Sequence, residues 1–216
     1  IKLTIRSRNF LGGLLMKEDK QKRIMEKGIE LFCEVGYLNT TVEKITNSLN
    51  ISKGSFYTYF ESKEALLLSI LDFMYINYEK ILNKLSEDVG SKELEEILEK
   101  YINVMFDSIL DSKNIISLIQ QVFTNDFFKS EKIKKIVHNF RLMDIEFIKE
   151  YIFKKIDFKY EMFDLNLISE YIISSIHTFI IIKMKEGEMG FIVENKVRIV
   201  KDIKFLLLYG ILKEEL

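Results

Sequence analysis

Apolar side chains recur at intervals of three and four residues along almost the whole chain, and this is the period of an α-helix. We find no persuasive strand alternation, no internal repeat and no low-complexity linker. The chain is therefore predicted to be all-α, with about nine helices. The absence of proline suits helix interiors, because proline lacks a backbone N–H and clashes with the preceding turn. A codon bias against proline would give the same absence, so the prediction does not depend on it.

Composition narrows the class of protein. Of the 216 residues, 48% are hydrophobic and 30% are charged, which is a globular balance rather than a disordered one. Cys33 is the single cysteine, which excludes an intrachain disulfide and a multi-cysteine metal site. We recognise no secretory leader, and no uninterrupted apolar run approaches the ~20 residues of a membrane span. We therefore expect a cytoplasmic protein with no membrane partner.

Local signals predict where the first helices begin and end. Gly36 ends the first helix, as glycine often does after a last turn. Thr40 lies three residues before Glu43, which is the pattern of a capping box and predicts the start of the second helix. Asn50 tolerates the left-handed conformation that a tight turn needs.

Two further N-caps are predicted at Ser52 and Ser62. The predicted helices cover about Lys17–Val35, Thr40–Leu49, Lys53–Phe60, Lys63–Ser86, Lys92–Leu110, Asn114–Phe123, Glu131–Phe153, Asn166–Lys185 and Glu194–Leu212. The second and third are short and are separated by a brief turn, which is typical of a helix-turn-helix. In that motif the N-terminal residues of the second helix meet base edges in the DNA major groove.

The same region carries a dense motif, Gly36-Tyr37…Thr40-Thr41-Val42…Ile45…Ile51-Ser52-Lys53-Gly54-Ser55-Phe56-Tyr57-Thr58-Tyr59-Phe60-Glu61-Ser62-Lys63-Glu64-Ala65-Leu66. Over about residues 20–70 it resembles the DNA-binding domain of the tetracycline-repressor (TetR) family. Thr46 and Leu49 stand where that family has alanine, and Asn50 where it has glycine. Because Leu49 is larger than alanine, the two helices are expected to cross a little differently.

The resemblance implies a set of DNA contacts. Hydroxyls and free N–H groups at helix N-termini suit phosphate, glycine lets the backbone approach closely, and lysine and tyrosine reach phosphates or base edges. Phe56 and Phe60, four residues apart, are expected to face the core. The predicted DNA contacts are Thr41, Ser52, Lys53, Gly54, Ser55, Tyr57, Thr58, Tyr59 and Lys63.

The charge distribution gives weak support for DNA at the front of the chain. Residues 1–63 carry 11 basic and 7 acidic side chains, net +4, against 21 and 26, net −5, in residues 64–216. Residues 1–15 are expected to be an extension ahead of a natural start at Met16, and without them the front is nearly neutral. We predict a DNA-binding domain at 16–63 and a regulatory domain at 64–216.

The last two predicted helices are apolar around more than one face, which indicates burial on all sides. A symmetric partner would provide it, as a four-helix dimer interface. This placement also matches where TetR-like proteins dimerise. The predicted interface residues are Ile172, Ser175, Ile176, Phe179, Val200, Ile203 and Leu207.

The middle helices mix aromatic, methionine and sparse polar residues, a composition that suits a small-molecule site as well as an ordinary core. The candidate effector-binding residues are Tyr101, Met105, Phe106, Gln120, Phe123, Phe140, Met143, Phe147, Tyr171 and His177. In the family, a ligand bound between these helices tilts the fourth helix and separates the two recognition helices.

The function predicted is therefore a homodimeric transcriptional regulator, a repressor that a small apolar or amphipathic effector releases from a pseudo-palindromic operator. Neither a metal site nor a cofactor is predicted, because His138 and His177 lie on different helices without a partner Cys or His. No catalytic motif is present, so no enzymatic activity is predicted. The alternative is a helical ligand-binding or protein-interaction bundle with a vestigial helix-turn-helix. Salt-dependent binding to a specific duplex discriminates between the two.

Overall fold

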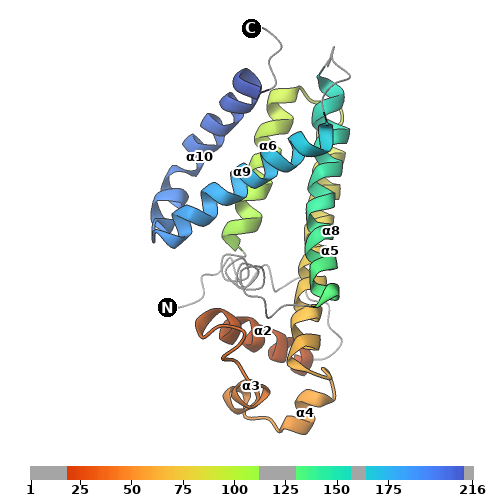
Figure 1. Cartoon of the computed structure of the whole chain (residues 1–216), viewed down its shortest axis with the longest axis vertical. Helices are drawn as coiled ribbons and strands as arrows, with labels where there is room; N and C mark the ends of the chain where they lie inside the picture. Colours follow the sequence, from red (N-terminus) through yellow and green to blue (C-terminus); the bar gives the residue numbers. More distant parts are fainter. Residues whose placement is uncertain (1–18, 112–129, 157–163, 212–216) are drawn as a thin grey trace. The chain divides into compact units, whose positions relative to one another are not determined.

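The computed structural model describes residues 19–111, 130–156 and 164–211. Within these ranges all regular elements are helices, which confirms the predicted fold class (Figure 1). The helix expected at Asn114–Phe123 and the expected N-terminal extension lie outside the described residues, as do Gln120 and Phe123.

Most helices lie close to the ranges predicted for them. They are α2 (Asp19–Glu34), α3 (Val42–Leu49), α4 (Lys53–Tyr57), α5 (Lys63–Val89), α6 (Leu94–Asp111), α8 (Glu131–Phe147), α9 (Leu165–Lys185) and α10 (Met189–Leu206). The π-helical turn η1 (Ile148–Ile152) and the 3₁₀ turn η2 (Phe153–Lys155) continue α8, and the π-helical turn η3 (Leu207–Ile211) continues α10. Two boundaries differ from the prediction, since α4 ends at Tyr57 rather than Phe60 and α10 begins five residues before Glu194.

The chain divides into two compact units. The N-terminal unit comprises residues 1–76 and 110–136, and the C-terminal unit comprises residues 77–109 and 137–216. α5 supplies residues to both. The domain boundary predicted at residues 63–64 stays a prediction.

The N-terminal unit is built on a small core between α2, α3, α4 and the start of α5. Phe32, Ile45, Phe56 and Leu66 are all fully buried there, one from each helix. At Gly28 a Cβ atom would lie only 2.8 Å from Cδ2 of Leu66. The absence of a side chain at this position therefore lets α2 and α5 approach closely.

The capping box predicted at Thr40 was wrong, because Thr41 is the N-cap of α3. The Oγ1 atom of Thr41 accepts a hydrogen bond from the Lys44 N–H at 3.1 Å. Thr40 is fully buried instead, and its hydroxyl donates to the carbonyl oxygens of Gly36 at 2.8 Å and Leu31 at 3.2 Å. A buried hydroxyl needs an acceptor, and two carbonyl oxygens at the end of α2, which also accept backbone N–H groups, supply it.

Replacing Thr40 with valine is expected to destabilise the N-terminal unit by about 1 kcal/mol, because two carbonyls each lose a side-chain donor while the shape is kept and their backbone donors remain. Urea unfolding followed by circular dichroism measures the change. Ser48→Ala is the matched control, since the Ser48 hydroxyl lies on exposed surface of α3 and donates only along its own helix. An unchanged unfolding midpoint in Thr40→Val would contradict this role.

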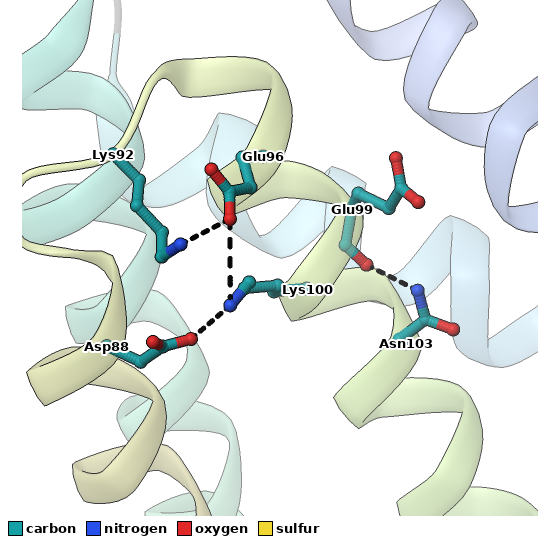
Figure 2. Close-up of polar contacts among 6 residues, drawn as sticks. All are labelled: Asp88, Lys92, Glu96, Glu99, Lys100 and Asn103. Carbon is teal, nitrogen blue, oxygen red and sulfur yellow. Dashed lines mark hydrogen bonds and ion pairs between the residues drawn. The ribbon is translucent and has the colours of Figure 1, made fainter.

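In the C-terminal unit, charged side chains join neighbouring helices. Figure 2 shows a chain of ion pairs in which Asp88 at the end of α5 contacts Lys100 of α6, while Glu96 contacts both Lys92 and Lys100. These pairs are largely exposed, so each adds little stability. Their contribution is to fix how α6 follows α5.

Two further ion pairs hold α10 against α6. Lys196 lies 2.7 Å from Asp107 and Lys204 lies 2.5 Å from Glu99. The α9–α10 connection is a tight turn in which Gly187 has φ 78°. Figure 1 shows α9 and α10 meeting at this turn.

α9 is unusually apolar for its length. Residues Leu165–Lys183 form one stretch that is long and apolar enough to cross a membrane by length and composition, and 28% of it is buried in the protein. Single polar residues interrupt this stretch, so no uninterrupted apolar run marks it in the sequence. Core helices of globular proteins meet the same criteria, so the stretch is weak evidence for a membrane.

Candidate nucleic-acid interface and effector site

The turn between α3 and α4 has the conformation that the sequence predicts. Asn50 adopts the left-handed region, at φ 54° and ψ 46°, and its N–H bonds back to α3. Ser52 then caps α4, and its Oγ accepts the Ser55 N–H at 3.1 Å. Asparagine adopts the left-handed region at a low energetic cost, which allows the chain to reverse direction at this turn. Both predictions are confirmed.

α4 is anchored on one side and exposed on the other. Phe56 is fully buried and Phe60 is 3% exposed, with 5.7 Å between their ring centroids, which confirms that both face the core. Tyr57 is 53% exposed. The remaining predicted contacts on this stretch, Thr41, Ser52, Lys53, Gly54, Ser55, Thr58 and Tyr59, are exposed or half-buried. The geometry therefore presents one polar face.

One acidic side chain lies on this face. Glu43 of α3 has a carboxylate oxygen 3.3 Å from Nζ of Lys53, and both side chains are more than half exposed. An exposed pair of this kind is weak. A DNA phosphate would compete with the Glu43 carboxylate for the same ammonium.

Lys63 has a role that sequence reasoning missed. Its ammonium donates to the carbonyl oxygens of Tyr37 at 2.6 Å and Thr40 at 2.7 Å, and lies 4.1 Å from the centre of the Tyr37 ring. Burial lowers the pKa of this lysine. Lys63 thus ties the start of α5 to the α2–α3 loop, while the phosphate contact that the resemblance implies stays a prediction.

Several candidate effector residues come together in the C-terminal unit. The rings of Tyr101 and Phe147 stack with their centroids 5.1 Å apart, and Tyr78 and Phe140 lie 6.0 Å apart. Met105 and Phe106 are buried nearby on α6, and Met143 is half-buried on α8. Tyr171 does not join them, because it is 63% exposed on α9.

The centre of this group is a residue that sequence reasoning missed. Asp144 of α8 is only 3% exposed, and its Oδ1 accepts hydrogen bonds from the hydroxyls of Tyr78 at 2.6 Å and Tyr101 at 3.0 Å. Burial raises the pKa of this carboxyl to about 6, although the two phenols oppose the rise. The signal available in the sequence was an aspartate flanked by Phe140 and Phe147. Residues four before and three after a given position lie on the same face of a helix.

His177 forms no ion pair with a carboxylate among the described residues. Burial, together with the positive charge of Arg141, lowers the pKa of His177 to about 4, so the imidazole is neutral at neutral pH. Among the residues that the structure describes, no group of three or more His, Cys, Asp or Glu is placed to hold a metal ion.

The predicted dimer residues divide into two sets. Ile172, Ile176, Val200 and Leu207 are buried within a single protomer. Ser175 is exposed, and Phe179 and Ile203 are half-buried. The exposed apolar residues of α9 and α10 are different ones, and the largest exposed fractions belong to Leu167, Tyr171, Val197, Phe205 and Leu206.

The fold and this site define a helix-turn-helix protein with a helical C-terminal unit. Residues 24–70 match the family described as bacterial regulatory proteins, tetR family. The match covers the helix-turn-helix and its neighbouring helices, and in this region the chain resembles regulators of the TetR family.

Two relatives are HTH-type transcriptional regulators of Bacillus subtilis strain 168 whose names mark them as uncharacterized. YerO is 37% identical over 101 residues, 47% of this chain, and YuxN is 35% identical over 133 residues, 61% of this chain. The matches span only 35% and 44% of these relatives' own lengths. The fatty acid degradation regulator FadR from Bacillus halodurans has a similar fold, with a TM-score of 0.67, 20% identity, and coverage of 91% of this chain and 98% of that one.

Proposed function

We propose that this protein is a cytoplasmic transcriptional repressor that binds a pseudo-palindromic operator as a homodimer and leaves it when a small effector binds. The observation that carries the proposal is the α3–α4 motif, in which a left-handed Asn50 and a buried Phe56 hold a polar face outward. That face has the residue types that contact phosphates and base edges.

The surface of the last two helices supports a homodimer. Exposed residues at positions 167, 171, 175, 178 and 182 of α9 share one helix face, and three of these five are large and apolar. On α10, Val193, Val197 and Phe205 are exposed at multiples of four residues. Exposed apolar surface of this extent is typical of a protein interface. We propose that α9 and α10 pair with their copies in a partner protomer.

Dimerisation would set the geometry of the operator. Two recognition helices related by a two-fold axis contact half-sites one DNA turn apart, roughly 34 Å. An effector then regulates binding only if it has a higher affinity for the state that cannot bind DNA. A near-complete switch needs a difference of about 5.5 kcal/mol.

The direct test is electrophoretic retardation of the DNA upstream of the protein's own gene, followed by footprinting. The expected result is a retarded complex at low salt and a footprint with two-fold symmetry. A footprint without symmetry, or no retardation at low salt, would refute the proposal. The latter result would instead support a ligand-binding bundle whose helix-turn-helix is vestigial.

Two substitutions on α4 are expected to separate affinity from selectivity. Tyr57→Phe removes a phenol expected to donate to a phosphate, so affinity should fall several-fold for all duplexes alike. Ser55→Ala removes a hydroxyl expected at the groove floor, so the order of preference among operator variants should change. Titrations against a panel of single-base operator variants measure both. Equal losses on every variant for Ser55→Ala would contradict a base contact.

A further inference from the structure

The C-terminal unit buries a carboxylate without a cation to pair with it. Asp144 lies on α8 with Phe140 and Phe147 on the same face, four residues before it and three after. Among the described residues no lysine, arginine or histidine forms an ion pair with it. A buried carboxylate is costly unless it is paired or hydrogen-bonded.

The nearest cation on the same helix is directed elsewhere. The Arg141 guanidinium donates to Glu170 at 3.2 Å and to the Ser174 hydroxyl at 3.0 Å, both on α9. Arg141 is exposed, whereas Asp144 is buried. The positive charge of Arg141 therefore serves α9 and does not pair with the Asp144 carboxyl group.

One oxygen of this carboxylate is left for another partner. The Tyr78 and Tyr101 hydroxyls both donate to Oδ1. Within the described parts of the chain, Oδ2 receives no hydrogen bond, and no fully buried side-chain oxygen lacks one. Asp144 as a whole residue is 3% exposed. An atom that binds there meets a negative charge held by neutral phenols.

Aromatic side chains from three helices gather around the Asp144 carboxyl group. Tyr78 from α5 and Tyr101 from α6 contact the carboxylate directly, and each packs against a phenylalanine from α8. Phe147 packs in turn against Tyr151, with 4.9 Å between their ring centroids. The faces of such rings attract cations, most strongly where water is excluded. A carboxylate among aromatic rings is suited to an organic ammonium group rather than to an anion.

We propose that Asp144, with the rings of Tyr78, Tyr101 and Phe147, recognises the positively charged head of an amphipathic organic cation that serves as the effector. This inference rests on the proposed function, because it assigns a chemical class to the effector of that regulator. An apolar tail would contact the buried side chains of α6 next to Tyr101, including Met105.

The test compares three probes with the same eight-carbon chain and different heads, namely octyltrimethylammonium, octanol and octanoate. Isothermal titration on the full-length protein is expected to show the cation binding about tenfold or more tightly than the alcohol, with octanoate weakest. Octanol or octanoate binding as tightly as the cation would overturn the proposal, as would no binding of the cation.

Substitutions test which residues produce the preference for the cation over octanol. Asp144→Asn is expected to reduce the preference for the cation over octanol to about twofold or less, and Phe147→Leu is expected to reduce it in part. Glu146→Gln is the matched control, since this carboxylate lies on the exposed side of α8 and should leave the preference unchanged. A preference that survives Asp144→Asn and Phe147→Leu in folded protein would refute the assignment.

The same samples distinguish this inference from the proposed function. If the protein retards its operator DNA and the cation neither binds nor releases it, the assignment of the effector fails and the regulator remains. If the cation binds and no operator DNA is retarded at low salt, the regulator fails and the binding site remains.

Discussion

Replacing Val197 with glutamate is expected to convert the dimer into a monomer and to lower the affinity for operator DNA by about 100-fold or more, because a monomer loses the second half-site. Val197 is 71% exposed in the protomer, so glutamate causes no strain when the chain folds alone. In a dimer the new carboxylate would be buried opposite its own symmetry mate, which is a costly arrangement. Sedimentation equilibrium and operator titration measure the two effects.

The matched control for this change is Ile81→Glu. Ile81 is also an exposed apolar residue of the C-terminal unit, 38% exposed, but lies on α5 outside the proposed interface. Its replacement should leave a dimer with unchanged affinity for DNA. A dimer that persists in Val197→Glu would show that α10 is not at the interface, and a monomer in Ile81→Glu would show that the interface includes α5.

The two proposals on the C-terminal unit share a physical basis. Folding leaves the apolar row of α9 and α10 exposed on the outside and a carboxylate unpaired on the inside. Each is an unfavourable feature of an isolated protomer. A partner protomer would cover the first, and a cationic effector would neutralise the second.

The features that could be predicted from the sequence are those that depend on a few neighbouring residues. The turn at Asn50 and the cap at Ser52 are decided within four residues, and both were predicted correctly. Thr40 and Thr41 show the limit of this reasoning, because both have the chemistry of a cap. Only the packing of α2 decides which hydroxyl is buried.

Contacts between distant residues could not be predicted in this way. The carbonyls that Lys63 binds lie 26 and 23 residues before it, and Tyr78 is 66 residues from Asp144. Sequence apolarity cannot separate two kinds of burial, for a related reason, and the interface residues stay a prediction. Apolarity at Ile172 and Val200 indicates that these side chains are covered, but it does not indicate whether their own protomer covers them.

Replacing Lys63 with methionine is expected to destabilise the N-terminal unit by about 2 kcal/mol, since two carbonyls lose a charged donor while the length of the side chain is kept. The α2–α3 loop that Lys63 holds leads directly into the N-cap of α3. Its loosening should displace the recognition helix and lower the affinity for every duplex by about 30-fold. Urea unfolding and DNA titrations over a range of salt concentrations measure both effects.

The variant Lys53→Met distinguishes the effect of losing a positive charge from the effect of displacing the helix-turn-helix. It removes the same charge from an exposed side chain whose sole described ion pair is with Glu43, so the stability of the unit should not change. Affinity should fall because a phosphate contact is lost, and the slope of log K against log salt should become shallower by about one. If Lys63 acts only as a phosphate ligand, its variant will match Lys53→Met in slope and in unfolding midpoint. If it positions the helix-turn-helix, the Lys63 variant alone will unfold at lower urea.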